Sequence, residues 1–252
     1  MGSVSADLIA DLAQYDTPTI CNVIELFDVR PRTEGYMRHD IRQSYATDKP
    51  MVGLATTASF RSSSAGLEGQ DVYSQMERQV QQFAEWSENG KLPLVVVFQD
   101  LDDPTVSATF GEVMCTTYKN FGCVGLVTSG TGRDIEQVQA LGDFAVFSKG
   151  NCCSHGYCHI TSINEPVHVG GLTVRPGDLI HGDANGVTNI PKEIAFYVAA
   201  LAPKFMEAED ATLSWLKKGS KDMHAWNQSR DRMNERMAQL KELALKLKNK
   251  DS

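Results

Sequence analysis

Residues 92–150 read LPLVVVFQDLDDPTVSATFGEVMCTTYKNFGCVGLVTSGTGRDIEQVQALGDFAVFSKG, and their pattern decides the fold class. Three apolar runs are typical of buried strands: LPLVVVF, CVGLVTS and FAVFSKG. Two segments of helical pattern separate these runs: ATFGEVMCTTYKNFG and DIEQVQALG. Strands that alternate with helices predict a parallel sheet with crossover helices, so an α/β core is expected.

Further helices and strands are expected on both sides of this core. Before it, helical patterns cover 5–15, 18–28 and 69–88, and the run MVGLATTASF at 51–60 predicts a strand. Thr17 is the expected cap of the second helix, with Pro18 at its first position. The third helix is expected to end at Asn89-Gly90.

After the core, residues 157–190 form short strand patterns separated by Gly-Gly, Pro-Gly and Asn-Gly, which are typical of hairpins. From Pro191 a helical pattern runs almost to the end and breaks near Gly219. We therefore expect an α/β domain over 1–219, including the N-terminal helices, and a C-terminal helical extension over 220–252. The apolar stripe of that extension either packs on its own chain or reaches a neighbouring subunit.

Composition excludes several classes of protein. The chain has 252 residues, 42% of them hydrophobic, and a formal net charge of -8. This is enough apolar material for a sizeable core, while the negative field repels phosphate backbones and anionic membranes. No run approaches the roughly 20 apolar residues of a spanning helix, and the start, MGSVSADLIADLAQ, does not resemble a signal peptide. A cytoplasmic protein without nucleic-acid or membrane partners is expected, and an anionic substrate would need a local cationic clamp.

One cluster of cysteines and histidines combines the natural ligands of zinc. Adjacent cysteines cannot readily both turn inward on a strand, and YCHITSI at 157–163 alternates as a strand does. Ordinary packing and loop roles are therefore favoured over a zinc site for this cluster: Cys152, Cys153, His155, Cys158 and His159.

The segment GLVTSGTGRD places a candidate anion site at the end of a buried strand. A Gly130-Thr131-Gly132 turn follows the strand, and Arg133 and Asp134 stand where a helix begins. Ligands of open α/β sheets bind at such strand ends. Arg133 can form two parallel hydrogen bonds to a carboxylate, and an ionised Asp134 can hold a hard cation such as Mg²⁺. A helix cap with an exposed ion pair is the equally weighted alternative.

A second candidate segment, FGEVMCTT, opens the preceding helix. Glu112 lies in its first turn, and the backbone amides of Val113 and Met114 can point outward if the helix begins there. If the two strands that precede these helices are parallel neighbours, Glu112 faces the same crevice as Arg133 and Asp134.

Other catalytic motifs are absent from the sequence. The Gly130-x-Gly132 turn lacks the third glycine of a dinucleotide fingerprint, which would fall at Ile135, and no Gly-Lys-Ser/Thr follows it. The chain has no Gly-x-Ser-x-Gly nucleophile elbow and no His-Glu-x-x-His zinc helix. His155 and His181 are interpreted as structural hydrogen-bonding residues, and Asp183 as the residue that fixes its own turn.

In order, the chain carries GEVM, Gly-x-x-x-Ser-Gly-x-x-Arg-Asp, FAVFSKG, SHG and VGGLTVRPGDLIHGDANGVTNIP. This ordered set resembles the RraA-like family, which includes the 4-hydroxy-4-methyl-2-oxoglutarate/4-carboxy-4-hydroxy-2-oxoadipate aldolases. The resemblance covers most of residues 17–219. It implies a phosphohistidine swivelling-domain-like α/β sandwich, assembled as a homotrimer or homohexamer with active sites between subunits.

The resemblance also implies a role for each candidate residue. Asp134 would bind Mg²⁺ or Mn²⁺, and Arg133 would hold the pyruvyl carboxylate or carbonyl of a 2-oxo acid. Glu112 would hold a metal-bound water, and the amides of Val113 and Met114 would bind the pyruvyl group. A carboxylate from the C-terminal helix of the adjacent subunit completes family sites. Glu209 fits that place best, with Glu207 as its rival.

The implied activity is cleavage of 4-hydroxy-2-oxo acids to pyruvate, or decarboxylation of oxaloacetate, since both reactions leave a pyruvate enolate. Four positions depart from the pattern of the family. Three have a neutral residue where an acid is usual, and one has glutamate where many members have aspartate: Asn22, Ser129 and Asn185, and Glu112. These departures concern substrate specificity. A branch of the family that inhibits an RNA-degrading endonuclease through protein contacts provides the alternative function, a non-catalytic regulator.

Overall fold

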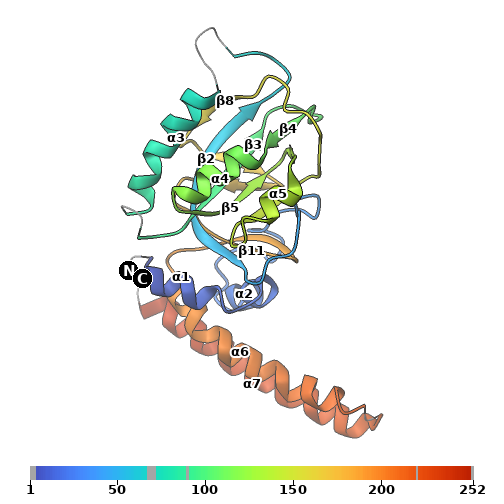
Figure 1. The fold of residues 1–252 in the computed structure, drawn as a ribbon. Coiled ribbons are helices and arrows are strands. Elements are labelled where there is room, and N and C mark those ends of the chain that lie inside the picture. Colours follow the sequence, from blue (N-terminus) through green and yellow to red (C-terminus); the bar gives the residue numbers. More distant parts are fainter. Residues whose placement is uncertain (1–3, 67–71, 89–90, 220, 251–252) are drawn as a thin grey trace.

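A mixed sheet forms the centre of the computed structural model, which describes residues 4–66, 72–88, 91–219 and 221–250 (Figure 1). The strands follow the order β1-β7-β5-β3-β2-β11-β12, and β8 pairs with β2. Their bounds are β1 Arg42–Gln43, β2 Met51–Arg61, β3 Leu94–Asp100, β5 Cys123–Thr128, β7 Ala145–Ser148, β8 His159–Ile163, β11 Leu179–Asp183 and β12 Gly186–Ile190.

The middle of this sheet is parallel, as the sequence pattern predicted. Strands β2, β3, β5 and β7 pair in parallel with one another, whereas every pairing that involves β1, β8, β11 or β12 is antiparallel. All three strands expected within 92–150 are present. The prediction of an α/β fold with a C-terminal helical region is confirmed.

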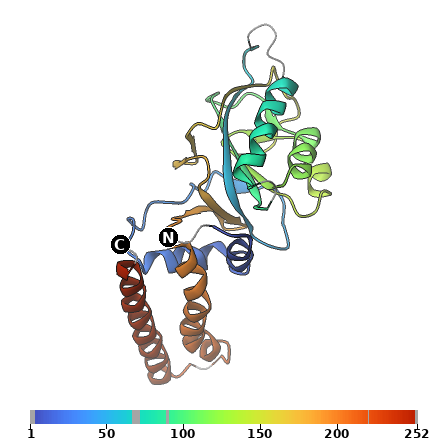
Figure 2. The same cartoon turned by 90° about the vertical axis from the view of Figure 1, so that its left-hand side faces the viewer.

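Alternate residues of the central strands pack into two separate hydrophobic cores, one on each face of the sheet. In β3, Leu94, Val96 and Phe98 pack on one face of the sheet, and Val95 and Val97 pack on the other. The first face lies under three helices, as Figure 2 shows: α3 (Val72–Trp86), α4 (Glu112–Asn120) and α5 (Ile135–Gln139). A hairpin of β9 (Val167–Val169) and β10 (Leu172–Val174) contributes to the second core.

The N-terminal helices are α1 (Ala6–Leu12) and α2 (Thr17–Glu25). The predicted cap of α2 is wrong by one residue. Asp16 is the N-cap, because its carboxylate accepts a hydrogen bond from the amide of Thr19 at 2.9 Å. The hydroxyl of Thr17 instead lies 3.0 Å from Nδ1 of His181.

Two other helix boundaries also differ from the sequence prediction. The segment 108–122 begins as a short strand, β4 (Ala108–Phe110), before α4 starts at Glu112, because β4 pairs with β6 (Thr131–Gly132). The described part of the helix expected at 69–88 is α3, and both its expected start and its Asn89-Gly90 stop lie outside the described residues.

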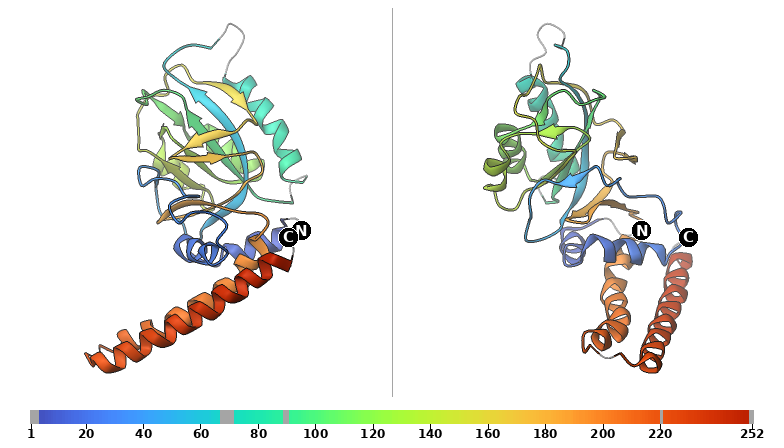
Figure 3. Two further views of the ribbon diagram at one scale, coloured as in Figure 1. Left: turned by 180° about the vertical axis from the view of Figure 1, so that it is seen from behind. Right: turned by 90° about the vertical axis from the view of Figure 1, so that its right-hand side faces the viewer.

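A long helical hairpin projects from the α/β body (Figures 1 and 3). It consists of α6 (Ala195–Leu216) and α7 (Met223–Lys250), and the predicted break lies at Gly219, whose φ is 71°. The helix begins at Ala195, not at Pro191, because 191–194 form a turn. Leu240 and Ala244 of α7 are buried on this chain, so the predicted stripe packs partly on its own molecule. A contact of this stripe with a neighbouring subunit, and the domain boundary at 219, stay predictions.

None of the helices in the described residues has the length and apolar character needed to cross a membrane.

Candidate active site

Two segments that precede helices meet beside the main sheet. Strands β4 and β6 pair in parallel, and the amide of Arg133 donates to the carbonyl of Phe110 at 3.1 Å. Position 132 must be glycine, because any Cβ there would overlap the ring of Phe110. This pairing, together with the parallel neighbours β3 and β5, sets the start of α4 beside Arg133 and Asp134. The prediction that both segments face one crevice is confirmed.

Asp134 adopts a backbone conformation with positive φ, which is uncommon for residues other than glycine. Its φ of 55° and ψ of 39° lie in the left-handed region. The carboxylate Oδ2 accepts a hydrogen bond from the amide of Glu112 at 3.1 Å and lies 3.6 Å from Nε of Arg133. A Cβ at Gly111 would stand 2.7 Å from the same oxygen. The Glu112 amide and Arg133 thus hold this carboxylate, which lies close against the backbone of Gly111.

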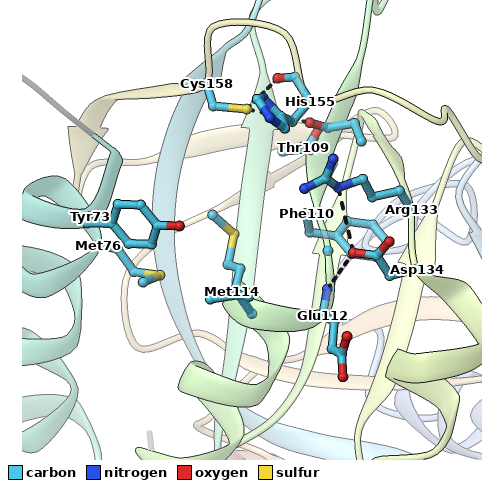
Figure 4. A pocket seen from close by; sticks show the side chains of 13 residues that line it. Tyr73, Met76, Thr109, Phe110, Glu112, Met114, Arg133, Asp134, His155 and Cys158 are labelled. Carbon is cyan, nitrogen blue, oxygen red and sulfur yellow. Dashed lines mark hydrogen bonds and ion pairs between the residues drawn. The ribbon is translucent and has the colours of Figure 1, made fainter.

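These groups open into a cavity of about 300 Å³ between α3 and the start of α5, which Figure 4 shows. A volume of this size suits a small metabolite. Its lining includes five residues that the sequence predicted for the site: Glu112, Val113, Met114, Arg133 and Asp134. Eight further residues complete the lining: Tyr73, Met76, Ala108, Thr109, Phe110, Gly111, His155 and Cys158.

The start of α4 offers backbone donors to this cavity. Gly111, its N-cap, has no side chain to bond the first amides, and the amide of Glu112 is taken by Asp134. Within the described residues, the amides of Val113 and Met114 have no hydrogen-bond partner. Such amides at the positive end of a helix dipole are suited to an anionic oxygen.

The carboxylate of Glu112 is exposed and points away from Arg133 and Asp134 (Figure 4). In this chain, therefore, the backbone amide of Glu112 contacts the Asp134 carboxylate, while the Glu112 side chain contacts neither Arg133 nor Asp134. Whether that side chain holds a water at a metal stays a prediction.

Glu209 lies on α6, away from the cavity of its own chain. It is not among the lining residues, and burial followed by the nearby charge of Asp16 raises the pKa of its carboxyl. Its rival Glu207 accepts a hydrogen bond on its carbonyl from Arg236 at 3.2 Å. Since the expected contribution comes from a neighbouring subunit, the role of either residue stays a prediction.

The structure adds Thr109 to the cavity lining, and it brings in His155 and Cys158, which the sequence analysis had assigned to packing and loop roles. Thr109 is 1% exposed, and its hydroxyl has no partner in the described residues. Burial raises the pKa of the Cys158 thiol to about 11, so this thiol is protonated at neutral pH, and its sulfur donates to the carbonyl of His155. Nδ1 of His155 lies 2.7 Å from the carbonyl oxygen of Gly156. The sequence did not place these residues at the site, because the fold brings the segment of His155 and Cys158 to the start of α4.

His181 and Asp183 have the structural roles predicted for them. His181 is completely buried, with Nε2 lying 3.2 Å from the Leu12 carbonyl and Nδ1 beside the Thr17 hydroxyl. Burial lowers the pKa of its imidazole. Asp183 accepts from the amide of Asn185 at 2.8 Å, which fixes the turn between β11 and β12.

A second cavity, of about 270 Å³, lies at the carboxyl ends of the parallel strands. Asp100, Ser129 and Lys149, which end or follow β3, β5 and β7, contribute to its lining. The amide of Asp100 donates to the Ser129 hydroxyl at 2.9 Å, and burial raises the pKa of the Asp100 carboxyl. Ser129 therefore lines this cavity and not the one that contains Asp134.

The donor set around Asp134 limits which metal the cavity can hold. The described residues contain no group of three His, Cys, Asp or Glu side chains placed to hold a metal ion. Oδ1 of Asp134 has no hydrogen-bond partner among them and is half of a partly exposed carboxylate. Mg²⁺ commonly takes one or two carboxylates and keeps several waters. The Asp134 carboxylate thus fits a hard divalent cation that is bound through one carboxylate and several waters.

Comparison with known proteins places this arrangement in a family. A family model described as RraA-like, Aldolase/RraA, matches residues 17–188. The chain belongs to the RraA-like family. Its cavity lies within the matched residues, and the helical hairpin lies beyond them.

Curated relatives match part of this RraA-like chain. A putative 4-hydroxy-4-methyl-2-oxoglutarate aldolase of Halalkalibacterium halodurans is 39% identical over 98 residues, which are 38% of this chain and 46% of the relative. An uncharacterized protein of Methanocaldococcus jannaschii is 40% identical over 88 residues, 34% of this chain and 42% of the relative. The chain thus spans less than half the length of these relatives.

Solved structures share the fold of this RraA-like chain more completely. A crystal structure described as one of novel cellulases from gut-associated microbes is 25% identical, with a TM-score of 0.67 over 83% of this chain and 88% of that one. RraAS2 of Streptomyces coelicolor, described as an unusual member of the RNase ES inhibitor RraA family, is 20% identical, with a TM-score of 0.64 over 85% of this chain and 100% of that one. The second likeness is of fold alone.

Proposed function

We propose that this RraA-like chain is a metal-dependent carbon–carbon lyase that generates pyruvate enolate. It would cleave 4-hydroxy-2-oxo acids to pyruvate and a carbonyl product, decarboxylate oxaloacetate, or do both. One observation carries the proposal: a cationic side chain, a carboxylate and two helix amides surround one cavity, and within the described part of the chain one carboxylate oxygen and both amides have no hydrogen-bond partner. These are Arg133, Asp134 and the amides of Val113 and Met114.

The cationic and amide groups match the pyruvyl end of such a substrate. The guanidinium of Arg133 would bind the substrate carboxylate, because an arginine can make two parallel hydrogen bonds to it. The amides of Val113 and Met114 would donate to the oxygen on which negative charge develops. Asp134 keeps Arg133 close through their 3.6 Å contact, so the binding group is held in place before the substrate arrives.

Asp134 is the proposed ligand of the divalent cation, through Oδ1. Mg²⁺ or Mn²⁺ held there would act as a Lewis acid toward the 2-oxo acid. Glu112 would orient a water that receives the 4-hydroxyl proton, and Glu209 of an adjacent subunit in a trimer or hexamer would close the site.

The relative named as a putative aldolase supports this proposal over the non-catalytic regulator. The likeness to the RNase ES inhibitor family is one of fold, and it brings no contact residue to this chain.

Exchange of the pyruvate methyl protons with deuterated water tests enolate formation directly, because it needs no knowledge of the natural substrate. Proton NMR would follow the methyl signal with Mg²⁺, with Mn²⁺ and with chelator. We expect metal-dependent exchange that Arg133→Met lowers by about 100-fold, a typical loss for one charge-stabilising donor. Arg232→Met, at an exposed position of α7, is the matched control. A folded protein without exchange under any metal would overturn the proposal in favour of a binding protein.

A further inference from the structure

The segment between β7 and β8 brings a histidine to the wall of the Asp134 cavity. His155 is one of the lining residues, and Figure 4 shows its ring near Thr109 and the guanidinium of Arg133. The sequence pattern indicated a structural role for this histidine. Its place in the lining, beside the group proposed to bind the pyruvyl carboxylate, instead allows its ring to contact a bound substrate.

Two backbone hydrogen bonds fix the turn that carries His155. The carbonyl of Ser154 accepts from the amide of Ala108 at 2.7 Å, and the amide of Tyr157 donates to the carbonyl of Ser62 at 2.9 Å. Ala108 begins β4, the strand that leads directly into the start of α4 at the cavity. The backbone on both sides of the histidine is therefore anchored to the same segment that presents the helix amides, and this restricts where the ring can lie.

A hydrogen bond within the turn orients the ring of His155 and fixes its tautomer. Nδ1 lies 2.7 Å from the carbonyl oxygen of Gly156. A carbonyl oxygen can only accept, so Nδ1 carries the proton, and Nε2 of the neutral ring has the lone pair. A histidine held in this way can take up a proton at Nε2 and give it back, which is the task of a general acid–base residue.

The thiol of Cys158, which lies beside His155 in Figure 4, is less suited to this task. Burial raises the pKa of the thiol to about 11, and its sulfur donates to the carbonyl of His155. A thiol with this pKa keeps its proton at neutral pH and does not accept another from a substrate. Imidazole is the side-chain group that ordinarily gains and loses a proton nearest to neutral pH, so the histidine is the better carrier.

We propose that His155 is the catalytic residue that moves the proton on C3 of the pyruvyl group. This inference rests on the proposed function of the same site, in which Glu112 acts on the 4-hydroxyl proton and no residue acts on C3. In proton exchange, Nε2 of the neutral ring takes a proton from the methyl group of pyruvate, and the electron pair of the broken C–H bond remains as the enolate. In cleavage, the protonated ring donates the proton on Nε2 to C3 of the enolate, and water then returns a proton to Nε2.

Removal of the ring, followed by addition of free imidazole, tests this proposal. His155 is exposed, so His155→Ala should keep the fold and leave room for imidazole beside the substrate. We expect metal-dependent exchange of the pyruvate methyl protons to fall by about 100-fold, a typical loss for a general acid–base group, and to recover at least about tenfold with imidazole. The same imidazole should not accelerate the wild type. A variant that exchanges as fast as the wild type, or whose slow exchange imidazole does not restore, would overturn the proposal.

His155→Asn is the matched variant that separates catalysis from the role of the turn. The amide nitrogen of asparagine can take the place of Nδ1 and donate to the carbonyl of Gly156, while Nε2 is lost. The thermal midpoint and the calorimetric Kd of pyruvate with Mg²⁺ should change little, whereas exchange should fall as it does in His155→Ala. His39→Gln, at an exposed position elsewhere on the chain, is the control and should exchange like the wild type. Exchange that is retained in His155→Asn would assign the histidine to the turn alone and contradict the proposal.

Failure of this inference can be told apart from failure of the proposed function. If the wild-type protein exchanges pyruvate methyl protons and His155→Ala exchanges them equally fast, the enolate chemistry stands and another group carries the proton. If the wild type exchanges no protons with any metal, the proposed function and this inference both fall.

Discussion

The carboxylate of Asp134 accepts a hydrogen bond from the backbone amide of Glu112, which lies 22 residues earlier in the chain, at 3.1 Å. This bond joins the first residue of α4 to the residue before α5. It uses one oxygen of the carboxylate and leaves the other for a ligand. Asp134 therefore stabilises the fold as well as the site, and the two roles can be separated by substitution.

Asp134→Ala should lower the free energy of unfolding by about 1–2 kcal/mol, because it removes an acceptor at a helix start and keeps a left-handed backbone. Asp134→Asn should lose less, since asparagine retains the acceptor and tolerates this conformation. Urea denaturation measures both, with exposed Asp143→Ala as the control. Equal stability of all three variants would show that the bond to Glu112 contributes nothing.

Gly111→Ala should harm the site more than the fold. The backbone of Gly111 is extended, with φ of -158°, so alanine is not strained there. Its Cβ would nevertheless stand 2.7 Å from Oδ2 of Asp134, and the carboxylate would have to move. We expect metal-dependent exchange of pyruvate protons to fall at least about tenfold, as misplacement of a catalytic group allows. Asn120→Ala, at the exposed end of α4, should retain exchange, and an active Gly111→Ala protein would argue against a fixed Asp134.

The Glu112→Gln variant separates the role of the backbone amide of this residue from the role of its carboxylate. The backbone amide that bonds Asp134 remains, so the thermal midpoint should change little, whereas loss of the carboxylate should lower kcat by at least about tenfold if it orients a proton-accepting water. The pH profile of kcat should also change. If kcat and its pH profile both match those of the wild type, the exposed carboxylate has no part in catalysis.

The burial of His181 should lower the free energy of unfolding in mild acid. Its imidazole is buried, and the pKa is lowered in the folded state, so below the unfolded value of about 6.5 the unfolded chain binds a proton that the folded chain does not. This contribution is present above pH 6.5 and is lost as the pH falls, by at most about 1.4 kcal/mol per pH unit.

Urea denaturation at pH 7 and pH 5.5 measures this effect, with His181→Gln as the non-titrating comparison. The wild type should lose more unfolding free energy between the two pH values than the variant does. If both lose the same amount, other groups account for the acid sensitivity.

The parallel core and the shared crevice could be predicted because both depend on local sequence. Buried runs of four to seven apolar residues mark β3, β5 and β7, and their parallel order brings the starts of α4 and α5 to one side. That order predicted that Glu112, Arg133 and Asp134 lie at one crevice.

The rest depends on contacts between distant segments. Strands β4 and β6 have three and two residues, too few for a periodic pattern, yet their pairing fixes Asp134. Asp16 and Thr17 are both good helix caps, and the choice is made by His181, 164 residues away from Thr17. Tyr73 and Cys158 reach the cavity only because α3 and the segment before β8 fold over it.

Pyruvate release tests the central claim most directly. Purified protein would be assayed with oxaloacetate and with 4-hydroxy-4-methyl-2-oxoglutarate in the presence of Mg²⁺, Mn²⁺ or chelator, beside the Asp134→Asn variant at a temperature where both proteins are folded. We expect turnover that requires the metal and falls at least about 100-fold in the variant, because a carboxylate ligand is replaced by a neutral amide. Turnover that survives both chelation and Asp134→Asn would contradict the account, since a divalent cation at Asp134 would then have no part in the reaction.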